Sequence, residues 1–132
     1  MRTVLDASAV IAAFRDEPAT IDLAGAIEDG SFMSASNLAE VAGWLARSGD
    51  ADQIRHIAET ANVAVVPLLE ELALRAGELE PMGRPFGLSL ADRCCLATAE
   101  AFDAQVLTTD RAWLELPSPW RERVVYVRAD AE

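Results

Sequence analysis

Four acidic residues occupy positions where a carboxylate could do chemistry. Two of them, Asp6 and Asp110, come directly after short apolar runs that are typical of strands. The other two, Glu40 and Asp92, lie in the first turns of segments with helical spacing. Clustered carboxylates suit Mg²⁺ or Mn²⁺, whereas Zn²⁺ would favour His and Cys. A divalent ion held in this way lowers the pKa of a bound water and supports hydrolysis of phosphodiesters.

Each of these acids also has a simpler interpretation, as a helix cap. The two that follow strands stand where a helix would begin, and Asp is a favoured N-cap residue. Glu40 could close a box with Asn37, and Asp92 lies three residues after Ser89 in a capping-box arrangement. Taken one at a time, capping is the commoner role for such residues.

Convergence of the four acids on one pocket would need a compensating positive charge. Two carboxylates ~4 Å apart repel by about 4 kcal/mol at an effective dielectric constant of ~20. That cost is comparable to much of a domain's net stability of ~5–15 kcal/mol. All eleven basic residues are arginines and lysine is absent, so the compensating charge is arginine or a bound divalent cation.

Short apolar strands alternate with helical segments along the chain. Strands are expected at residues 2–6, 31–35, 63–68, 105–109 and 124–128. Helices are expected at residues 8–15, 18–30, 36–48, 50–62, 68–79 and 89–102, with a loop at 81–87. The alternation predicts a single α/β domain over residues 1–132, with a central parallel sheet covered on both faces. Ligands of such sheets gather at the carboxyl ends of the strands, near a reversal of strand order.

The composition excludes several classes of function. With 132 residues, 52% of them hydrophobic, the chain is expected to form one core. A formal net charge of −11 argues against nonspecific attraction to nucleic acid, so any such contact must be local. The absence of lysine excludes P-loop chemistry and phosphatases that use a catalytic lysine.

The remaining features favour a soluble cytoplasmic protein. No apolar stretch approaches the roughly 20 residues that span a bilayer, and no signal-peptide pattern is present. Adjacent Cys94 and Cys95 would point apart on a helix, so we expect free thiols in a reducing compartment. His56, the single histidine, lies far in sequence from every acidic motif and is expected to be a surface or half-buried residue rather than a general base.

Four motifs around these acids resemble those of PIN-domain ribonucleases, and within that family the chain is similar to VapC-type toxins of type II toxin–antitoxin pairs. The motifs are "VLDASAV", "SASNLAEV", "LSLADRCCLATA" and "VLTTDRAW", and they span nearly the whole chain in the family's order. The resemblance implies a three-layer α/β/α fold with a central parallel sheet. It also implies an endoribonuclease that cleaves single-stranded RNA with Mg²⁺ or Mn²⁺.

The resemblance assigns roles by position. It implies that the catalytic residues, which bind the metal, are Asp6, Glu40, Asp92 and Asp110. Thr108 matches a hydroxyl position in the fourth motif and would contact the ligands rather than the ion. Ser8 matches a small hydroxyl position after the first aspartate.

The family also implies a homodimer and a cognate VapB-type antitoxin whose tail wraps the toxin and blocks its active site. Three arginines lie near the motifs in sequence, Arg84, Arg93 and Arg111. They could contact substrate phosphates or the antitoxin, or form salt bridges that temper the carboxylates. Trp44 is expected in core or dimer packing, and the places of Trp113 and Trp120 stay open.

Two alternative functions are excluded because the chain lacks residues that they need. A haloacid-dehalogenase-like phosphatase needs a second aspartate where Ser8 stands and a later lysine, and a phosphoacceptor receiver domain also needs a lysine. The remaining alternative is a catalytically inactive PIN-like scaffold that binds a partner protein and whose acids serve as caps.

Overall fold

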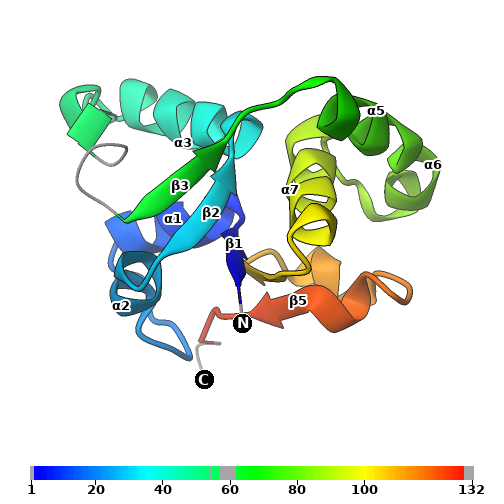
Figure 1. Ribbon diagram of the computed structural model, residues 1–132. Helices are drawn as coiled ribbons and strands as arrows, with labels where there is room; N and C mark the ends of the chain where they lie inside the picture. Colours follow the sequence, from blue (N-terminus) through cyan, green and yellow to red (C-terminus); the bar gives the residue numbers. More distant parts are fainter. Residues whose placement is uncertain (1, 54, 57–61, 130–132) are drawn as a thin grey trace.

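The computed structural model describes residues 2–53, 55–56 and 62–129, and these residues form a parallel sheet flanked by helices (Figure 1). The strands are β1 (Thr3–Leu5), β2 (Ser31–Ser34), β3 (Val63–Val66), β4 (Gln105–Thr108) and β5 (Val124–Tyr126). Their order across the sheet is β3-β2-β1-β4-β5, and every pairing is parallel. The direction of strand succession therefore reverses between β1 and β4, where ligand sites of such sheets form.

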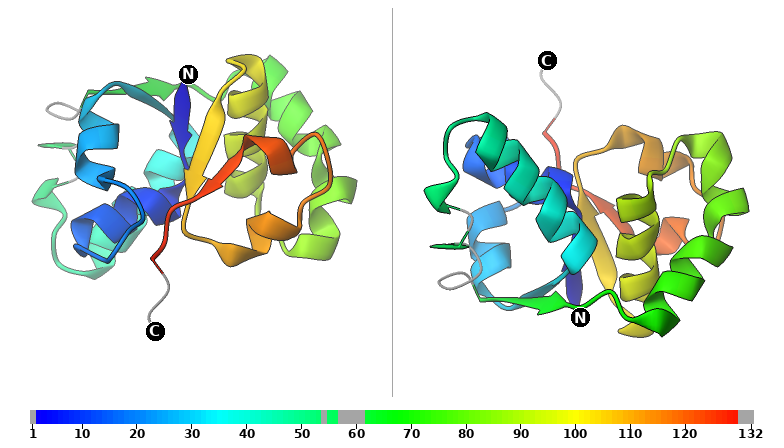
Figure 2. Two further views of the ribbon diagram at one scale, coloured as in Figure 1. Left: turned by 90° about the horizontal axis from the view of Figure 1, so that it is seen from below. Right: turned by 90° about the horizontal axis from the view of Figure 1, so that it is seen from above.

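Helices cover both faces of this sheet. They are α1 (Ala7–Phe14), α2 (Leu23–Glu28), α3 (Ala35–Arg47), α5 (Glu70–Glu78), α6 (Glu80–Gly83) and α7 (Leu90–Ala101). Short 3₁₀ turns follow at η1 (Arg84–Phe86), η2 (Arg111–Glu115) and η3 (Arg121–Arg123). Figure 2 shows the sheet between one layer that contains α1, α2 and α3 and another that contains α5, α6 and α7. The predicted three-layer α/β/α fold is confirmed.

Strand alternation divides the core into two clusters. Val4 and Val106 pack on the side of α7, whereas their neighbours Leu5 and Leu107 pack on the side of α1. This division follows from the two-residue period of a strand, which sends successive side chains to opposite faces.

Several residues whose positions were predicted or left open from the sequence lie in the core cluster beside α7. Trp113 and Trp120 are buried in it, so both are packing residues. Cys94 and Cys95 are buried free thiols in the same cluster, as predicted.

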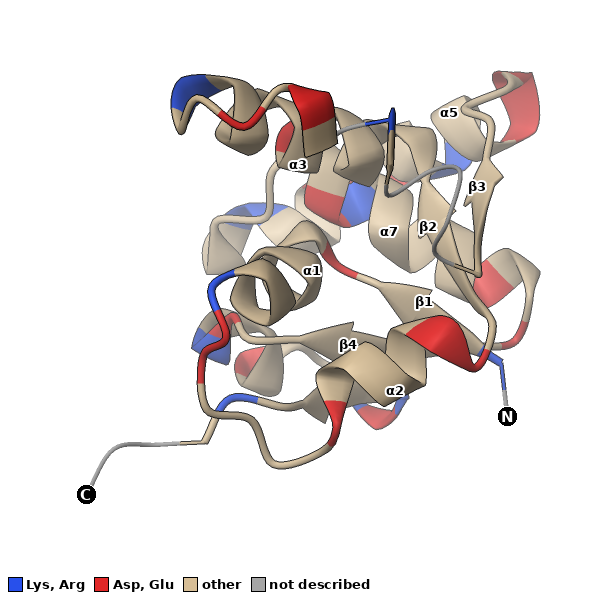
Figure 3. Ribbon diagram, turned by 90° about the vertical axis from the view of Figure 1, so that its left-hand side faces the viewer, with Lys and Arg blue, Asp and Glu red and all other residues tan. Residues whose placement is uncertain are grey.

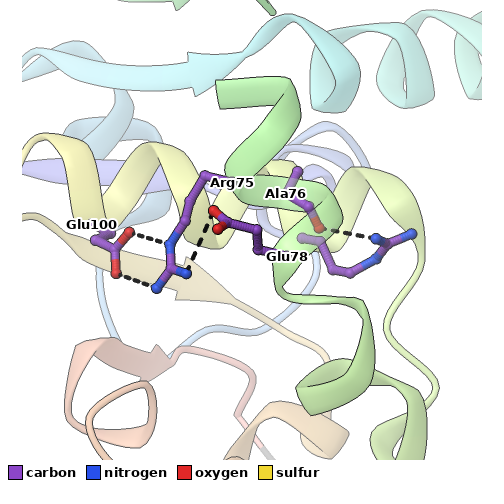
Figure 4. Close-up of polar contacts among 5 residues, drawn as sticks. Arg75, Ala76, Glu78 and Glu100 are labelled. Carbon is purple, nitrogen blue, oxygen red and sulfur yellow. Dashed lines mark hydrogen bonds and ion pairs between the residues drawn. The ribbon is translucent and has the colours of Figure 1, made fainter. Parts of the chain in front are cut away.

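Two arginines join α5 to α7 (Figure 4). Arg75 donates from Nε to Glu100 Oε1 at 2.7 Å and from Nη2 to Glu100 Oε2 at 3.0 Å. Arg93 donates from Nη1 to the carbonyl oxygen of Ala76 at 2.9 Å. The Arg93 contact holds the N-terminal half of α7, which carries Asp92, against α5, and the Arg75–Glu100 pair holds the C-terminal end of α7 there.

Two predicted elements differ from the structure. The helix expected at 18–30 is only α2, because Asp22 caps it by accepting from the Gly25 N–H, while Ala19 forms an antiparallel bridge with Arg128. The loop expected at 81–87 is instead helical through α6 and η1, since a proline fits the first turn of a helix at no cost in hydrogen bonds.

Of the helix expected at 50–62, residues 54 and 57–61 lie outside the described part of the chain, and the described residues 52, 53, 55 and 56 are helical. None of the described helices is both long and apolar enough to cross a membrane.

Candidate active site

Asp6 directly follows β1 at the reversal of strand order, and its side chain does not act as a cap. Its backbone N–H donates to Leu107 O on β4 at 3.0 Å, which places the residue between the two central strands. Asp6 occupies the N-cap position of α1, but its side chain makes no capping hydrogen bond. The residue is only 3% exposed. The capping interpretation is therefore wrong for Asp6.

Two hydroxyls hold the Asp6 carboxylate instead. Ser8 donates to Asp6 Oδ2 at 2.7 Å, and Thr108 donates to the same oxygen at 2.8 Å. Each hydroxyl oxygen also accepts a backbone N–H, from Thr109 to Ser8 and from Asp110 to Thr108, both at 3.0 Å. Because both hydroxyls bond Oδ2, they leave Oδ1 for another ligand.

Glu40 lies on α3 and is oriented through a polar chain within the first turns of that helix. Ser34 caps α3 by accepting from the Asn37 N–H at 3.1 Å. Asn37, fully buried, donates from its side-chain amide to Glu40 Oε1 at 3.4 Å. No role was predicted for Ser34, although it begins the motif "SASNLAEV" and the three-residue spacing from Ser34 to Asn37 to Glu40 is visible in the sequence.

Asp92 lies in the first turn of α7 and forms the capping box that its spacing predicted. The Ser89 N–H donates to Asp92 Oδ2 at 2.8 Å, and the Asp92 N–H donates to Ser89 Oγ at 3.1 Å. The box uses Oδ2, so Oδ1 stays available for a second interaction. For Asp92, capping and participation in a site are compatible.

These three carboxylates converge from β1, α3 and α7. Asp6, Glu40 and Asp92 each offer an oxygen within 4.8 Å of the oxygens offered by the other two. Figure 3 shows acidic segments of α3, α7 and the end of β1 around one part of the molecule. The cluster lines one pocket, with Asp6 buried, Asp92 half-buried and Glu40 exposed.

Burial and mutual repulsion favour the protonated forms of these acids. The pKa of Asp6 is raised from 3.8 to about 7, mainly by burial and also by the charges of Asp92 and Glu40, while the Ser8 and Thr108 hydroxyls lower it in part. Burial, and then the Asp92 charge, raises the pKa of Glu40. The pKa of Asp92 is raised by burial and by Asp110, although bonds from Ser89 oppose the change. A bound cation would offset this repulsion and favour the charged forms of the three acids.

Asp110 lies at the rim of the pocket rather than in the three-residue cluster. It lines the pocket with the other three acids, but its side chain is exposed and accepts the Ala112 N–H at 3.0 Å as the cap of η2. The structure thus brings three of the four predicted acids within 4.8 Å of one another and leaves the fourth beside them.

None of the three arginines near the motifs lines the acidic pocket. Arg84 is exposed and pairs with Glu80, with an Nε to Oε1 distance of 2.8 Å. Arg93 points to α5, as described above, and neither residue lines the acidic pocket. Arg111 lies over the Tyr126 ring, 5.4 Å from its centroid, in a neighbouring pocket that shares Ser8 and Asp110 with the acidic one.

Two other residues of α3 line the acidic pocket. Trp44 is half-buried there, and Arg47 is exposed at its edge. Trp44 also packs against the core cluster beside α1, which confirms the expected core packing, and Arg47 was not singled out by any motif. Their positions four and seven residues after Glu40 were the signal that could have found them, because such residues share one helix face.

The donor set fits a hard divalent cation. The cluster offers carboxylate oxygens from three residues and no imidazole or thiolate ligand. Such a set suits Mg²⁺ or Mn²⁺, which accept oxygen ligands and keep part of their water shell. An ion held there could activate water and polarise a phosphodiester.

Comparisons with known proteins agree with this fold. A family model described as PIN domain matches residues 3–118. A toxin–antitoxin complex from Klebsiella pneumoniae is similar at a TM-score of 0.67 and 18% identity, over 93% of this chain and 95% of that one. VapBC2 from Rickettsia felis, bound to a promoter DNA fragment, is similar at a TM-score of 0.68 and 18% identity, over 89% of this chain and 94% of that one.

A third similar structure is VapC20 from Mycobacterium tuberculosis, described as a sarcin–ricin loop cleaving toxin. It has a TM-score of 0.66 and 16% identity, over 91% of this chain and 93% of that one. No curated protein sequence matches this chain at a significant level.

Proposed function

The chain belongs to the PIN-domain family, and from this premise we propose that it is a divalent-metal-dependent endoribonuclease acting as the toxin of a toxin–antitoxin pair. The observation that carries the proposal is the convergence of Asp6, Glu40 and Asp92 within 4.8 Å. Similar structures include a toxin–antitoxin complex and a toxin that cleaves the sarcin–ricin loop, which supports the same activity here.

The three converging carboxylates would hold the ion, and Asp110 would complete the acidic set from the rim. Mg²⁺ or Mn²⁺, when bound, would lower the pKa of a water and stabilise negative charge on the phosphodiester. Asp110 uses Oδ1 to cap η2, so Oδ2 stays available toward the pocket.

The supporting polar residues would keep these carboxylates in position. Ser8 and Thr108 hold Asp6 through Oδ2, and Asn37 holds Glu40 through Oε1. Ser89 holds Asp92 through Oδ2. Every member of the cluster therefore has one oxygen fixed by the protein, and a preorganised site needs less rearrangement on binding the ion and the substrate.

We also propose the partners that such a toxin requires. They are an RNA substrate, a VapB-type antitoxin that covers the site, and a second copy of the chain in a homodimer. The VapBC2 complex on its promoter DNA and the Klebsiella complex support the antitoxin partner.

Replacement of Asp6 tests the proposed function. In Asp6→Asn, the amide keeps an oxygen that can accept from Ser8 and Thr108, so the fold should persist while the negative charge is lost. We expect RNA cleavage with Mg²⁺ or Mn²⁺ to fall below detection, measured by mapping the ends of cellular RNA after incubation with the purified protein.

A matched control is Asp16→Asn. Asp16 is exposed after α1 with φ of +52°, a conformation that asparagine also tolerates. Wild-type cleavage by this control is expected. Undiminished cleavage by Asp6→Asn would remove Asp6 from the site, and intact RNA with the wild-type protein and metal would favour the inactive scaffold.

A further inference from the structure

We propose that Trp44 and Arg47 form a nucleotide subsite beside the carboxylates, where the Trp44 ring stacks on a base of single-stranded RNA and Arg47 binds a neighbouring phosphate. The subsite rests on the proposed nuclease function and specifies how the substrate lies in that pocket.

Helix α3 aligns the three groups that the subsite requires. Glu40, Trp44 and Arg47 stand at positions i, i+4 and i+7, so their side chains share one face of the helix. With a rise of about 1.5 Å per residue, the Cα atoms of Trp44 and Arg47 lie about 6 Å and about 10 Å along the helix axis from that of Glu40. All three residues line the same pocket.

Trp44 is supported from one side and lines the pocket as well. The Phe14 ring of α1 packs against it, with centroids 6.3 Å apart and an interplanar angle of 48°. Ile11, also from α1, lines the pocket beside it. A half-buried indole fixed in this way offers a ring surface to a flat ligand, and stacking on aromatic rings is how proteins hold unpaired bases.

Arg47 supplies a local positive charge that the chain otherwise lacks at this pocket. Among the described residues that line it, Arg47 is the one cation. A Cβ built on Gly43 would lie 3.8 Å from Arg47 Nη1, so the guanidinium extends back along α3 beside that glycine. In the described part of the chain, Arg47 takes part in none of the ion pairs.

These observations favour RNA over a peptide as the occupant. A chain of net charge −11 repels a phosphate strand except where a metal ion or an arginine offsets that charge. A peptide that neutralised the carboxylates with its own arginine would bring a like charge toward Arg47. An RNA strand instead offers a base to the indole and a phosphate to the guanidinium.

The test measures binding of RNA apart from its cleavage. A short, labelled, single-stranded RNA is titrated against Asp6→Asn protein and against the same protein with Trp44→Leu, Trp44→Phe or Arg47→Gln, and the Kd is read from anisotropy at several salt concentrations. Emission of the protein with Trp44 intact gives a second readout. The other two tryptophans, Trp113 and Trp120, are 0% and 6% exposed.

Each variant has its own expected signature. Trp44→Leu should weaken binding at least about fivefold with an unchanged salt slope, and Trp44→Phe should restore most of the affinity because an aromatic face remains. Arg47→Gln should lower the slope of log Kd against log salt by about 0.7, the value for one phosphate contact on a single strand. Arg84→Gln is the matched control and should change neither quantity, because Arg84 pairs with Glu80 outside the pocket.

The outcomes separate this proposal from the proposed function. An unchanged Kd and salt slope in the Trp44 and Arg47 variants, with metal binding and cleavage intact in the protein that keeps Asp6, would overturn the subsite alone. Quenching of Trp44 by an arginine-rich peptide but not by RNA would overturn it in favour of a peptide groove. Failure of the protein that keeps Asp6 to bind metal or cleave RNA would instead overturn the nuclease function.

Discussion

Asp6 is the residue that ties the stability of this protein most directly to pH. Its pKa is about 7 in the folded protein because burial disfavours its charged form, whereas an unfolded chain would titrate it near 3.8. Between these two values the folded state holds a proton that the unfolded state releases. The free energy of unfolding of the metal-free protein should therefore fall as pH rises through this window, by up to about 4 kcal/mol. Denaturant unfolding at pH 5 and pH 8 in chelator measures the part of this change that lies above pH 5, up to about 3 kcal/mol.

Other acids also contribute to the pH dependence, and the variant Asp6→Asn separates the contribution of Asp6 from theirs. Glu40 and Asp92 also have raised pKa values, so they act in the same direction. Arg75 lowers the pKa of Glu100 from its ordinary value of 4.5. The effect of Glu100 on the free energy of unfolding therefore changes only at pH values below about 4.5, outside the range compared. Asp6→Asn should flatten the profile, and an equally steep profile in that variant would contradict the assignment to Asp6.

Single residues show where sequence reasoning succeeds and where it stops. The motif around Asp6 identified a carboxylate at the end of a strand, and the structure places it in the predicted pocket. The role of Ser34 was not predicted, because a cap and an oriented amide depend on the turn that precedes the helix. The sequence left the role of Arg93 open between substrate, antitoxin and a salt bridge, because its direction is set by the packing of α7 on α5, which sequence spacing does not contain.

Helix α3 contains a glycine that lowers the stability of the helix and also lines the acidic pocket. Gly43 is inside the helix, where glycine costs about 0.5–1 kcal/mol relative to alanine. A Cβ would meet only Arg47 Nη1, at an ordinary distance of 3.8 Å. We expect Gly43→Ala to raise the free energy of unfolding by up to about 1 kcal/mol. It should also weaken RNA binding, because the added methyl group enters the pocket that Gly43 lines.

Gly77→Ala provides the matched control for that helix substitution. Gly77 lies in α5, where a Cβ would meet nothing within 4 Å, and it does not line the acidic pocket. It should increase stability without any change in RNA binding. Equal effects of the two substitutions on binding would show that Gly43 has only a structural role.

Elements were predictable from the sequence where the local signals agreed. Strands β1 to β5 were located by their apolar and β-branched runs, and α7 by its capping box and apolar face. The start of α2 was misplaced, because Pro18 is a helix-start signal but Asp22 is the residue that caps the helix. Ala19, the residue after Pro18, pairs with Arg128 far along the chain, an interaction that no local pattern reveals.

At the scale of the whole molecule, the sheet order brings distant segments into one pocket. Asp6 and Thr108 are 102 residues apart in sequence but bond directly because β1 and β4 are adjacent. The sequence identified the acids and the fold class. It could not show that Asp110 would lie outside the three-residue cluster, since that depends on how η2 follows β4.

The net charge of −11 and the acidic cluster together predict a response to divalent cations. Mg²⁺ or Mn²⁺ bound by Asp6, Glu40 and Asp92 would relieve their repulsion in the folded state and would find no such site in the unfolded chain. At a concentration one hundred times Kd, binding adds about 2.7 kcal/mol to the free energy of unfolding. We therefore expect millimolar Mg²⁺ or Mn²⁺ to raise the melting temperature by several degrees, measured by differential scanning calorimetry.

Screening of the excess negative charge could also stabilise the fold, so site binding must be separated from it. Na⁺ at matched ionic strength screens the whole surface equally well and should produce a much smaller shift. Asp6→Asn removes one ligand from the cluster but only one of the chain's many negative charges, so its shift with Mg²⁺ should fall to the Na⁺ value. It should also melt higher than wild type in chelator at pH 8, because the buried charge is gone. Equal shifts with Mg²⁺ and Na⁺ in the wild-type protein would mean that the cluster binds no ion and that its acids are tolerated by protonation alone.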